Sequence, residues 1–578
     1  MTADPSREPL LRAAVVLAAT APSLLAANVS PSPTFWNQAL ALGLWGGFVL
    51  MQGVGAPAGG GGALRASWTV QLALALLGAA ALASGTLGAL PSALCLSALG
   101  LLAAAALLVH AGAAARSGPE STALFALFAW GWLVAGLLNV GVGLVQVFVP
   151  AWADGDWIAA SNIVGRAVGN LRQPNHLSSL LVWSAIATVA LLQLRRLAWP
   201  LAAAAFAAVV FGVVLTASRT GLASVAILAL WGLVDRRLTR PARALLLLAP
   251  LLYALAWMGM AKWAELSQHT FGGAARLAET DVSGSRFGIW ANTLALIRLH
   301  PLWGVGFGEF NLAWSLTPFP GRPTAFFDHT HNLPLQFAVE LGLPLAGLVL
   351  ALLLGGLGQV LRQAWQEDGD EGATRRAGLV FVLMIGLHSL LEYPLWYAYF
   401  LLPAAWAFGH ALGLPAPRGL RRRSLPLLAP AAALLVAGAA FSVWDYTRVT
   451  TIFAAAEGAP PLAQRIERGQ RSAFFAHHAD YAAATTDTEP RLREHAFDRA
   501  AHFLLDTRFM MAWADELAER GDVDRARHIA ARLREFRNPL AKDWLAECDA
   551  PREKDVEPPY QCAPPQRVYV WRDFLPRR

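Results

Sequence analysis

Charged residues are scarce in this chain. Asp, Glu, Lys and Arg together make up only 15% of its 578 residues, whereas 56% of the residues are hydrophobic. A soluble chain of this length would carry about a quarter charged residues, so the composition excludes an ordinary soluble protein. Apolar runs of about 20 residues recur along the first three quarters of the chain, and such runs are long enough to cross a bilayer. The sequence therefore predicts an all-α, polytopic membrane protein.

Cysteine is also rare, with three residues in the whole chain. Cys95 lies within an apolar run, where we expect its thiol to be inert. Cys548 and Cys562 lie in the polar C-terminal part. If that part faces the periplasm, these two cysteines are a candidate disulfide.

Motifs for binding RNA or DNA are missing too. The net charge of +7 is not evidence for a nucleic-acid partner, because membrane proteins collect Lys and Arg in their cytoplasmic loops. We therefore expect the lipid bilayer, and no nucleic acid, as the surrounding partner.

The apolar runs predict about 13 spans. A membrane domain over residues 1–443 is then followed by a small α-helical domain over 444–578, in which Met511–Glu519 and Val523–Phe536 have the pattern of a helical hairpin. Residues 10–28 could be misread as a signal peptide, but so many further runs follow that an uncleaved first span is the better interpretation. The expected spans are 12–28, 38–56, 68–86, 91–110, 122–149, 176–194, 198–217, 220–234, 242–261, 333–360, 377–392, 395–412 and 425–443.

Arginines fall in every second loop between these spans, which makes those loops cytoplasmic. The N-terminus is then inside, and the long loop 262–332 and the tail from residue 444 face outward, as do the turns at Ser218-Arg219 and Glu392-Tyr393. The arginines in question are Arg7, Arg12, Arg65, Arg116, Arg195, Arg196, Arg236, Arg237, Arg240, Arg362, Arg375, Arg376, Arg418, Arg421, Arg422 and Arg423.

Titratable groups gather just before one long apolar run, in the stretch Asp328-His329-Thr330-His331-Asn332. Asn332 can cap that run as a helix start, and Pro334 is tolerated in a first helical turn. The partial positive charge at a helix N-terminus attracts an anion and favours a neutral imidazole. The pattern indicates a base, His331, working beside a phosphate.

A metal site is the alternative for this stretch. Two histidines separated by one residue, with an Asp beside them, can be metal ligands. However, side chains at i and i+2 point the same way only in extended structure, and the nearby sequence offers no convincing third ligand. We therefore expect no metal and no cofactor.

Four other polar clusters lie at predicted outward turns, and each also has a plainer interpretation. The cluster Asn170–His176, with Gln173 and Asn175, is also typical of a helix cap, and Ser218–Gly221, with Arg219, of a snorkelling arginine. Gly284–Trp290, with Arg286, is also typical of a solvated arginine, and Glu392–Tyr397, with Tyr393, of an interfacial aromatic belt. Because the guanidinium fork matches phosphate oxygens, two outward arginines suit a diphosphate.

Taken together, these motifs resemble the O-antigen ligase/polymerase superfamily. Within it, the chain most resembles the bacterial O-linked protein glycosylation ligases, which modify pilins and other periplasmic proteins. Gly169–Leu177 is similar to the segment typical of that protein-glycosylating branch. The wider ligase pattern is carried by Ser218–Gly221, Gly284–Trp290, Pro301–Gly308 and His329–Asn332, within a likeness that covers roughly residues 160–410.

The resemblance implies a multi-span fold of GT-C type in the bacterial inner membrane, with the active site on the periplasmic side and no metal. It implies undecaprenyl-diphosphate-linked oligosaccharide as the donor and a Ser or Thr hydroxyl of a periplasmic, pilin-like protein as the acceptor. His331 would then activate the acceptor. Arg219 and Arg286 would hold the diphosphate.

Further residues enter through the same resemblance as substrate-binding candidates. These are Gln173, Asn175, His176, His329 and Tyr393, with Tyr397 as a competitor for the role of Tyr393. Two alternatives stay open at this point. One is the same chemistry with another acceptor, as in O-antigen ligation to lipid A-core or repeat-unit polymerisation. The other is a transporter of lipid-linked glycan, which would place ionisable residues inside its spans and show internal repeats.

The predicted topology can be tested with reporter tags. A reporter that works only outside the cytoplasm should give signal when inserted in 262–332 or 444–578, and none in 362–376 or 418–423. A cytoplasmic tail would contradict the charge-based topology, and with it the proposed link between Cys548 and Cys562.

Overall fold

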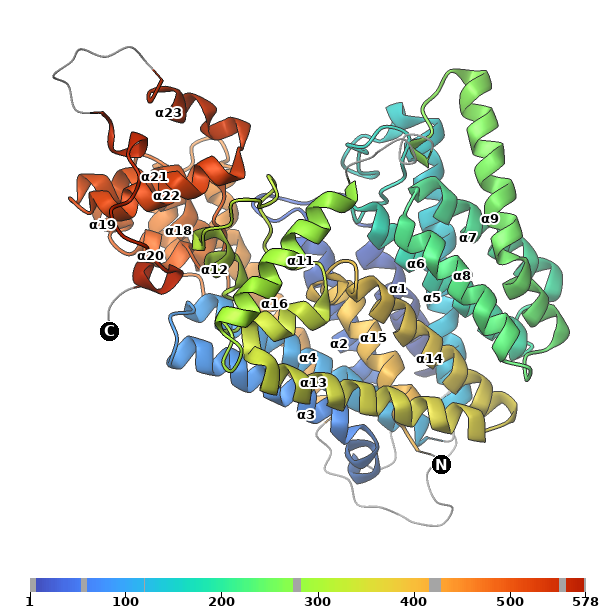
Figure 1. Ribbon diagram of the computed structural model, residues 1–578. Helices are drawn as coiled ribbons and strands as arrows, with labels where there is room; N and C mark the ends of the chain where they lie inside the picture. Colours follow the sequence, from blue (N-terminus) through green and yellow to red (C-terminus); the bar gives the residue numbers. More distant parts are fainter. Residues whose placement is uncertain are drawn as a thin grey trace. The chain divides into compact units, whose positions relative to one another are not determined.

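The computed structural model describes residues 7–53, 60–118, 120–273, 282–414, 428–549 and 558–575. These residues form helices joined by turns, with no strand among them (Figure 1). The prediction of an all-α membrane protein is therefore confirmed for the described part of the chain.

The chain divides into two compact units. Unit 1 comprises Met1–Leu74, Leu101–Glu279 and Ala351–Val443, and unit 2 comprises Ala75–Gly100, Thr280–Leu350 and Trp444–Arg578. Unit 2 thus unites the polar tail with most of the long loop. The division at residue 443 that the sequence suggests stays a prediction.

The helices that fall on apolar runs are α1 (Arg7–Leu24), α2 (Phe35–Gly53), α3 (Gly60–Thr86), α4 (Ser92–Arg116), α5 (Ser121–Phe148), α6 (Pro174–Gln193), α7 (Trp199–Thr216), α8 (Arg219–Val234), α9 (Arg240–Ser267), α13 (Leu333–Gln366), α14 (Gly369–Ser389), α15 (Ala398–Leu412) and α16 (Leu428–Phe453). Every predicted span overlaps one of them, although 38–56 and 425–443 run partly outside the described residues. Among the described residues, eight helices are long and apolar enough to cross a membrane. Three helices, α1, α8 and α15, are apolar but shorter. The total number of spans and their orientation stay predictions.

The long loop and the tail are also helical. The loop contains α11 (Val282–Leu299) and α12 (Phe310–Leu316). The predicted hairpin appears as α21 (Thr507–Glu519) and α22 (Val523–Phe536). The remaining elements of the tail are α17 (Leu462–Gln470), α18 (Ala476–Thr485), α19 (Pro490–Arg493), α20 (Ala496–Ala500), α23 (Lys542–Ala546) and three short 3₁₀ turns at Pro539–Ala541, Tyr560–Cys562 and Trp571–Phe574.

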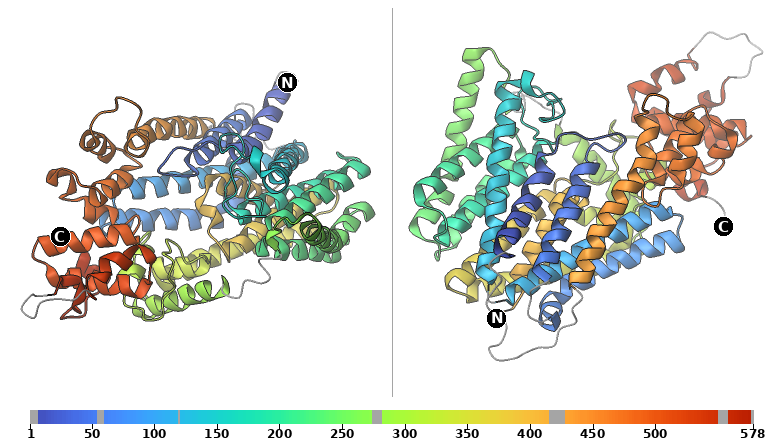
Figure 2. Two further views of the ribbon diagram at one scale, coloured as in Figure 1. Left: turned by 90° about the horizontal axis from the view of Figure 1, so that it is seen from above. Right: turned by 180° about the vertical axis from the view of Figure 1, so that it is seen from behind.

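Helix α6 is the centre of unit 1. It packs against α5, α7, α8 and α14, and every residue from Pro174 to Leu192 is buried. Figure 1 shows it among these neighbours, and Figure 2 shows the same helices from above and from behind. A helix that is apolar on every face is stable inside a protein core or in lipid, and α6 lies inside the core of unit 1. Close approach is achieved at Gly136 of α5, where a Cβ would collide with Ser184 of α6.

Buried ion pairs join the ends of several helices in unit 1. Arg376 donates to Asp235 at 2.8 Å, and Arg375 donates to Glu367 at 2.7 Å. Both arginines lie inside α14, which begins eight residues before the predicted span at 377. The helix can extend this far because each buried guanidinium has a carboxylate partner, without which burial would be strongly unfavourable.

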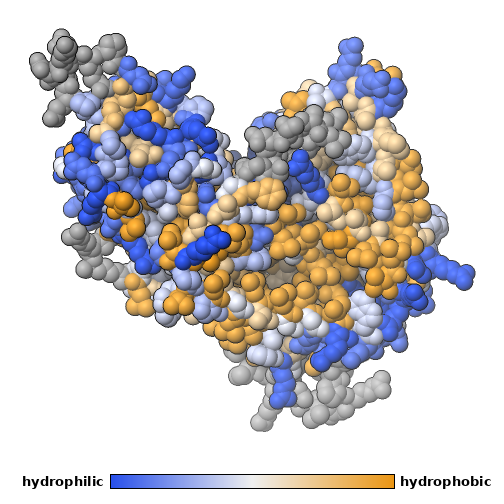
Figure 3. All heavy atoms as spheres, viewed as in Figure 1, coloured by the Kyte–Doolittle hydropathy of each residue, from blue (hydrophilic) through white to orange (hydrophobic). Residues whose placement is uncertain are grey.

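The tail carries the disulfide that the sequence suggested. Cys548 and Cys562 are bonded, with their Cα atoms 5.2 Å apart. Cys95 is a free, buried thiol. On the face shown in Figure 3, the tail is mainly hydrophilic, whereas hydrophobic residues gather over α8 and α9. The side of the membrane on which the tail lies stays a prediction.

A break in α13 receives the loop Pro301–Gly308. The backbone of Gly342 is non-helical, with φ 76° and ψ 161°. Pro344 has no N–H to donate to the carbonyl of Glu340, and the N–H of Gly306 donates to that carbonyl instead at 3.0 Å. In the same way, the N–H of Val305 donates to the carbonyl of Val339 at 2.8 Å. The loop therefore supplies hydrogen bonds that the interrupted helix lacks.

We expect Gly342→Ala to destabilise the protein, because only glycine readily adopts this backbone conformation and a Cβ there would collide with the carbonyl of Leu302. The expected loss is roughly 1–3 kcal/mol, seen as a lower Tm of the full chain in detergent. Gly347→Ala is the matched control, since a Cβ at that position meets nothing within 4 Å. Equal Tm values for the two variants would contradict this account of the break.

Candidate functional site

The N-terminus of α6 is capped by a predicted site residue. Gln173 has an extended backbone, and its side-chain oxygen accepts a hydrogen bond from the N–H of His176 at 2.7 Å. Pro174 follows at the first helical position, where its missing N–H is harmless. The cap satisfies one of the donors that every helix start leaves without a partner in the helix. The polar cluster thus begins a buried helix, and both the capping interpretation and a functional role remain compatible with it.

Asn175 joins three segments that are far apart in sequence. Its side-chain oxygen accepts from the hydroxyl of Ser218 at 2.6 Å, and its amide donates to the carboxylate of Glu392 at 3.1 Å. Ser218 and Glu392 are both buried. Three of the four predicted polar clusters therefore meet at this residue, within unit 1.

His176 is enclosed by tyrosines. Only 4% of its surface is exposed, its Nδ1 atom lies 3.1 Å from the hydroxyl of Tyr399, and the ring of Tyr397 is 4.6 Å away. The ring of Tyr393 stacks on Tyr397 at 6.1 Å. Sequence reasoning selected Tyr393 with Tyr397 as competitor and missed Tyr399. The signal that could have found Tyr399 is a tyrosine within an apolar run, close to an otherwise buried histidine.

Arg219 begins α8. The preceding Ser218 caps this helix by accepting from the N–H of Gly221 at 3.0 Å, and it is the same serine that donates to Asn175. The side chain of Arg219 is exposed. A second arginine, Arg166, was missed by the sequence reasoning. It is buried, and its Nε donates to the carbonyl of Thr216 at 2.9 Å, three residues before Arg219.

In unit 2, residues 326–332, which we call the His331 segment, lead into α13. Asn332 caps that helix as predicted, since its side-chain oxygen accepts from the N–H of Leu335 at 3.1 Å. His331 has a left-handed backbone with φ 55°, and its ring stands perpendicular to that of Phe327 at 5.3 Å. The histidine that we proposed as base therefore lies directly before the cap.

Asp328 and His329 form a local pair, with Nδ1 of His329 3.1 Å from the Asp328 carboxylate. Burial would raise the pKa of Asp328, but the imidazoles of His329 and His331 outweigh it and lower the pKa below its usual value. Among the described residues, no group of three or more His, Cys, Asp or Glu side chains is arranged to hold a metal ion.

A buried polar chain fixes the middle of the His331 segment. The N–H of Thr330 donates to the side chain of Gln336 at 2.8 Å, and Gln336 in turn donates to Glu340 at 2.9 Å. All three residues are buried. Neither Gln336 nor Glu340 was singled out from the sequence, although a Gln and a Glu four residues apart in an apolar run share one helix face.

Arg286 lies in the first part of α11, and its side chain is half-buried. Trp290, four residues later, shares its helix face. The indole N–H of Trp290 donates to the carbonyl of Thr330 at 2.9 Å. Arg286 therefore lies on the face of α11 that packs on the His331 segment.

The predicted residues thus fall into two groups. Gln173, Asn175, His176, Arg219 and Tyr393 belong to unit 1, whereas Arg286, His329 and His331 belong to unit 2. That the two groups form one site is a proposal.

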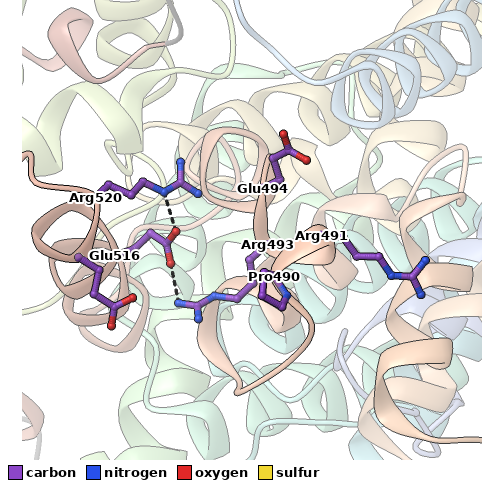
Figure 4. Close-up of a pocket in the computed structure, with 7 residues that line it drawn as sticks. Pro490, Arg491, Arg493, Glu494, Glu516 and Arg520 are labelled. Carbon is purple, nitrogen blue, oxygen red and sulfur yellow. Dashed lines mark hydrogen bonds and ion pairs between the residues drawn. The ribbon is translucent and has the colours of Figure 1, made fainter.

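A separate cavity of about 390 Å³ lies in the tail, and it contains none of the predicted residues. Figure 4 shows that Glu516, in its wall, pairs with both Arg493 and Arg520. Glu516 accepts from both Arg493 and Arg520, each at 2.7 Å. Because its lining carries three arginines and three glutamates, the cavity does not present a charge of one sign to a ligand.

Three family models match the chain. The O-antigen ligase model matches residues 202–352, the model described as protein glycosylation ligase matches 167–192, and the model described as virulence factor membrane-bound polymerase, C-terminal, matches 377–543. The 167–192 match contains the capped start of α6. The 202–352 match contains Arg219, Arg286 and His331.

Two curated proteins of Acinetobacter baylyi are similar to the chain. A general O-oligosaccharyltransferase is 26% identical over 258 residues, which is 42% of this chain and 43% of that protein. A ComP-specific O-oligosaccharyltransferase is 25% identical over 285 residues, which is 47% of each. The chain thus spans less than half the length of these relatives. The resemblance drawn from the motifs is confirmed: the chain carries segments that match the O-antigen ligase and protein glycosylation ligase models, and it is similar to two bacterial O-oligosaccharyltransferases.

Proposed function

We propose that this chain is an O-oligosaccharyltransferase of the bacterial inner membrane, with its active site on the periplasmic side. It moves an oligosaccharide from undecaprenyl diphosphate to Ser or Thr hydroxyls of periplasmic, pilin-like proteins. The observation that carries the proposal is the protein glycosylation ligase match over the buried, capped start of α6. The similarity to two O-oligosaccharyltransferases supports it.

In the proposed reaction, the acceptor hydroxyl attacks the anomeric carbon of the donor sugar. A carbon–oxygen bond to the acceptor forms as the bond to the diphosphate breaks. The hydroxyl proton passes to His331, which acts as general base because a free hydroxyl is a weak nucleophile near neutral pH. Undecaprenyl diphosphate leaves with the bonding electron pair.

The leaving diphosphate needs positive charge close to it. Arg219 and Arg286 supply it as planar forks that match phosphate oxygens. The starts of α8 and α13 add partial positive charge at their N–H groups. The substrate-binding site is completed by Gln173, Asn175, His176, His329 and Tyr393. No metal or other cofactor is required in this scheme.

The main alternative is the same chemistry with another acceptor, either lipid A-core or a growing O-antigen chain. The O-antigen ligase match over 202–352 and the polymerase match over 377–543 favour it. A transporter of lipid-linked glycan is the alternative of another class. Co-expression with a glycan pathway and a candidate pilin separates these functions, because only protein glycosylation adds the glycan mass to the pilin.

The role of the arginines is tested by substitutions that keep the charge. Arg219→Lys and Arg286→Lys lose the bidentate fork, so we expect weaker use of the lipid diphosphate donor, measured as a raised KM for the donor, with folding intact. Wild-type transfer rates in both variants would show that these arginines are interfacial or structural.

The base is tested at His331, with its neighbour as control. His331→Ala should lower transfer by a factor of roughly a hundred to ten thousand, while the protein still inserts and binds donor. His329→Ala should be milder. Transfer is measured by the mass of the acceptor protein.

Chelation separates this scheme from a metal site. EDTA should leave transfer unchanged. Loss of activity that a divalent ion restores would assign Asp328, His329 and His331 to a metal site.

Full activity of His331→Ala would mean that another group is the base.

A further inference from the structure

The seven-residue helix α12 lies between the tail and the His331 segment. All of its residues are buried, and it packs on α11, α22 and the turn Trp571–Phe574. A helix this short has few hydrogen bonds of its own, so its position depends on its neighbours. Glu309, directly before α12, pairs with His502 of the tail at 2.7 Å, and both side chains are buried.

Asn311 of α12 connects the two sides through its amide group. Its oxygen accepts from the N–H of Leu505 in the tail at 2.8 Å. Its nitrogen donates to the carbonyl of Phe327 in the His331 segment, also at 2.8 Å. Because only 4% of Asn311 is exposed, losing either bond would leave a buried polar group unsatisfied, which is more unfavourable than losing a bond at the surface.

Phe536, the last residue of α22, makes a direct apolar contact with the same segment. Its ring stacks on Phe326 at 3.8 Å with an angle of 16° between the planes. It also stands edge-on to Trp314 of α12 at 5.3 Å, and the guanidinium of Arg322 lies 4.4 Å from its ring centre. Phe536 is fully buried. The close packing of Phe536 on Phe326 buries both rings against each other, and the edge-to-face contact with Trp314 contributes beyond its buried area. These contacts favour one arrangement of the segment.

We infer that the tail is a positioning element for His331, acting through Phe536 and Asn311 on the His331 segment. That segment is neither helix nor strand, and such stretches open locally unless side chains hold them. Phe327, whose carbonyl Asn311 binds, also packs on His331 at 5.3 Å. The tail therefore restricts the orientation of the imidazole through Phe536 and Asn311. Only the consequence for catalysis rests on the proposed function.

Hydrogen exchange of the full chain in detergent tests the positioning directly. Phe536→Leu removes the ring that stacks on Phe326. Phe509→Leu removes an equally buried ring whose partners Tyr481, Phe497 and Trp513 all lie in the tail. We expect faster exchange in residues 326–332 for Phe536→Leu than for Phe509→Leu. Equal exchange in that stretch for the two variants would overturn the inference.

Asn311→Leu is the second variant, for use if Phe536→Leu does not fold. It keeps a side chain of similar size and removes both hydrogen bonds, so the same faster exchange in residues 326–332 is expected. Unchanged exchange there would overturn the inference in the same way.

Kinetics then connect the positioning to the reaction. A misoriented base should lower kcat by about ten- to a hundredfold while the KM for the donor stays unchanged. Phe509→Leu should keep wild-type kcat. A Phe536→Leu variant that exchanges faster yet keeps wild-type kcat would overturn the catalytic part of the inference. If the wild-type chain transfers no glycan, the proposed function fails, and the exchange measurement still decides whether the tail positions the segment.

Discussion

Side-chain capping at the start of apolar helices is the interaction on which the proposed site depends. Gln173 caps α6, Ser218 caps α8 and Asn332 caps α13. The N–H groups at a helix start have no partner within the helix, and in a bilayer an unsatisfied N–H is costly. The caps meet this requirement with neutral groups. They leave the partial positive charge of each helix start available to an anion.

The residues of the proposed site follow from where these caps stand. Arg219 is the first residue after Ser218, His331 is the last before Asn332, and His176 supplies the N–H that Gln173 accepts. Polar side chains are tolerated beside an apolar run mainly at its ends, so capping and chemistry occupy the same few positions. The proposed donor, which is partly lipid, fits such positions, because its lipid would stay in the bilayer while its diphosphate would bind at a helix start.

Local patterns explain how much of this could be predicted. Span positions, the cap at Asn332, the tail hairpin and the disulfide depend on periodicity, residue type or spacing, all of which are readable from the sequence. The partners of Asn175 were not readable, because Glu392 is 217 residues away. The same holds for Tyr399 beside His176 and for the loop that completes α13 at Gly342. Each of these contacts depends on packing between segments that are far apart in the sequence. In the sequence itself, such a contact is visible only as a single polar residue or glycine within an apolar run.

The backbones of His176 and His331 are held in place in different ways, and the difference explains what the tail contributes. His176 lies on a helix that is surrounded on every side, so its backbone is fixed by the packing of unit 1. His331 lies in an irregular segment with a left-handed backbone, and its surroundings must supply that rigidity. Thr330 is held from the side of α13 through Gln336, and Phe327 from the side of α12 through Asn311. The proposed base, on an irregular segment, can therefore be oriented by two buried hydrogen bonds, provided that α12 itself is held. The contacts that hold α12 come from α22 and the turn Trp571–Phe574 in the tail, together with α11.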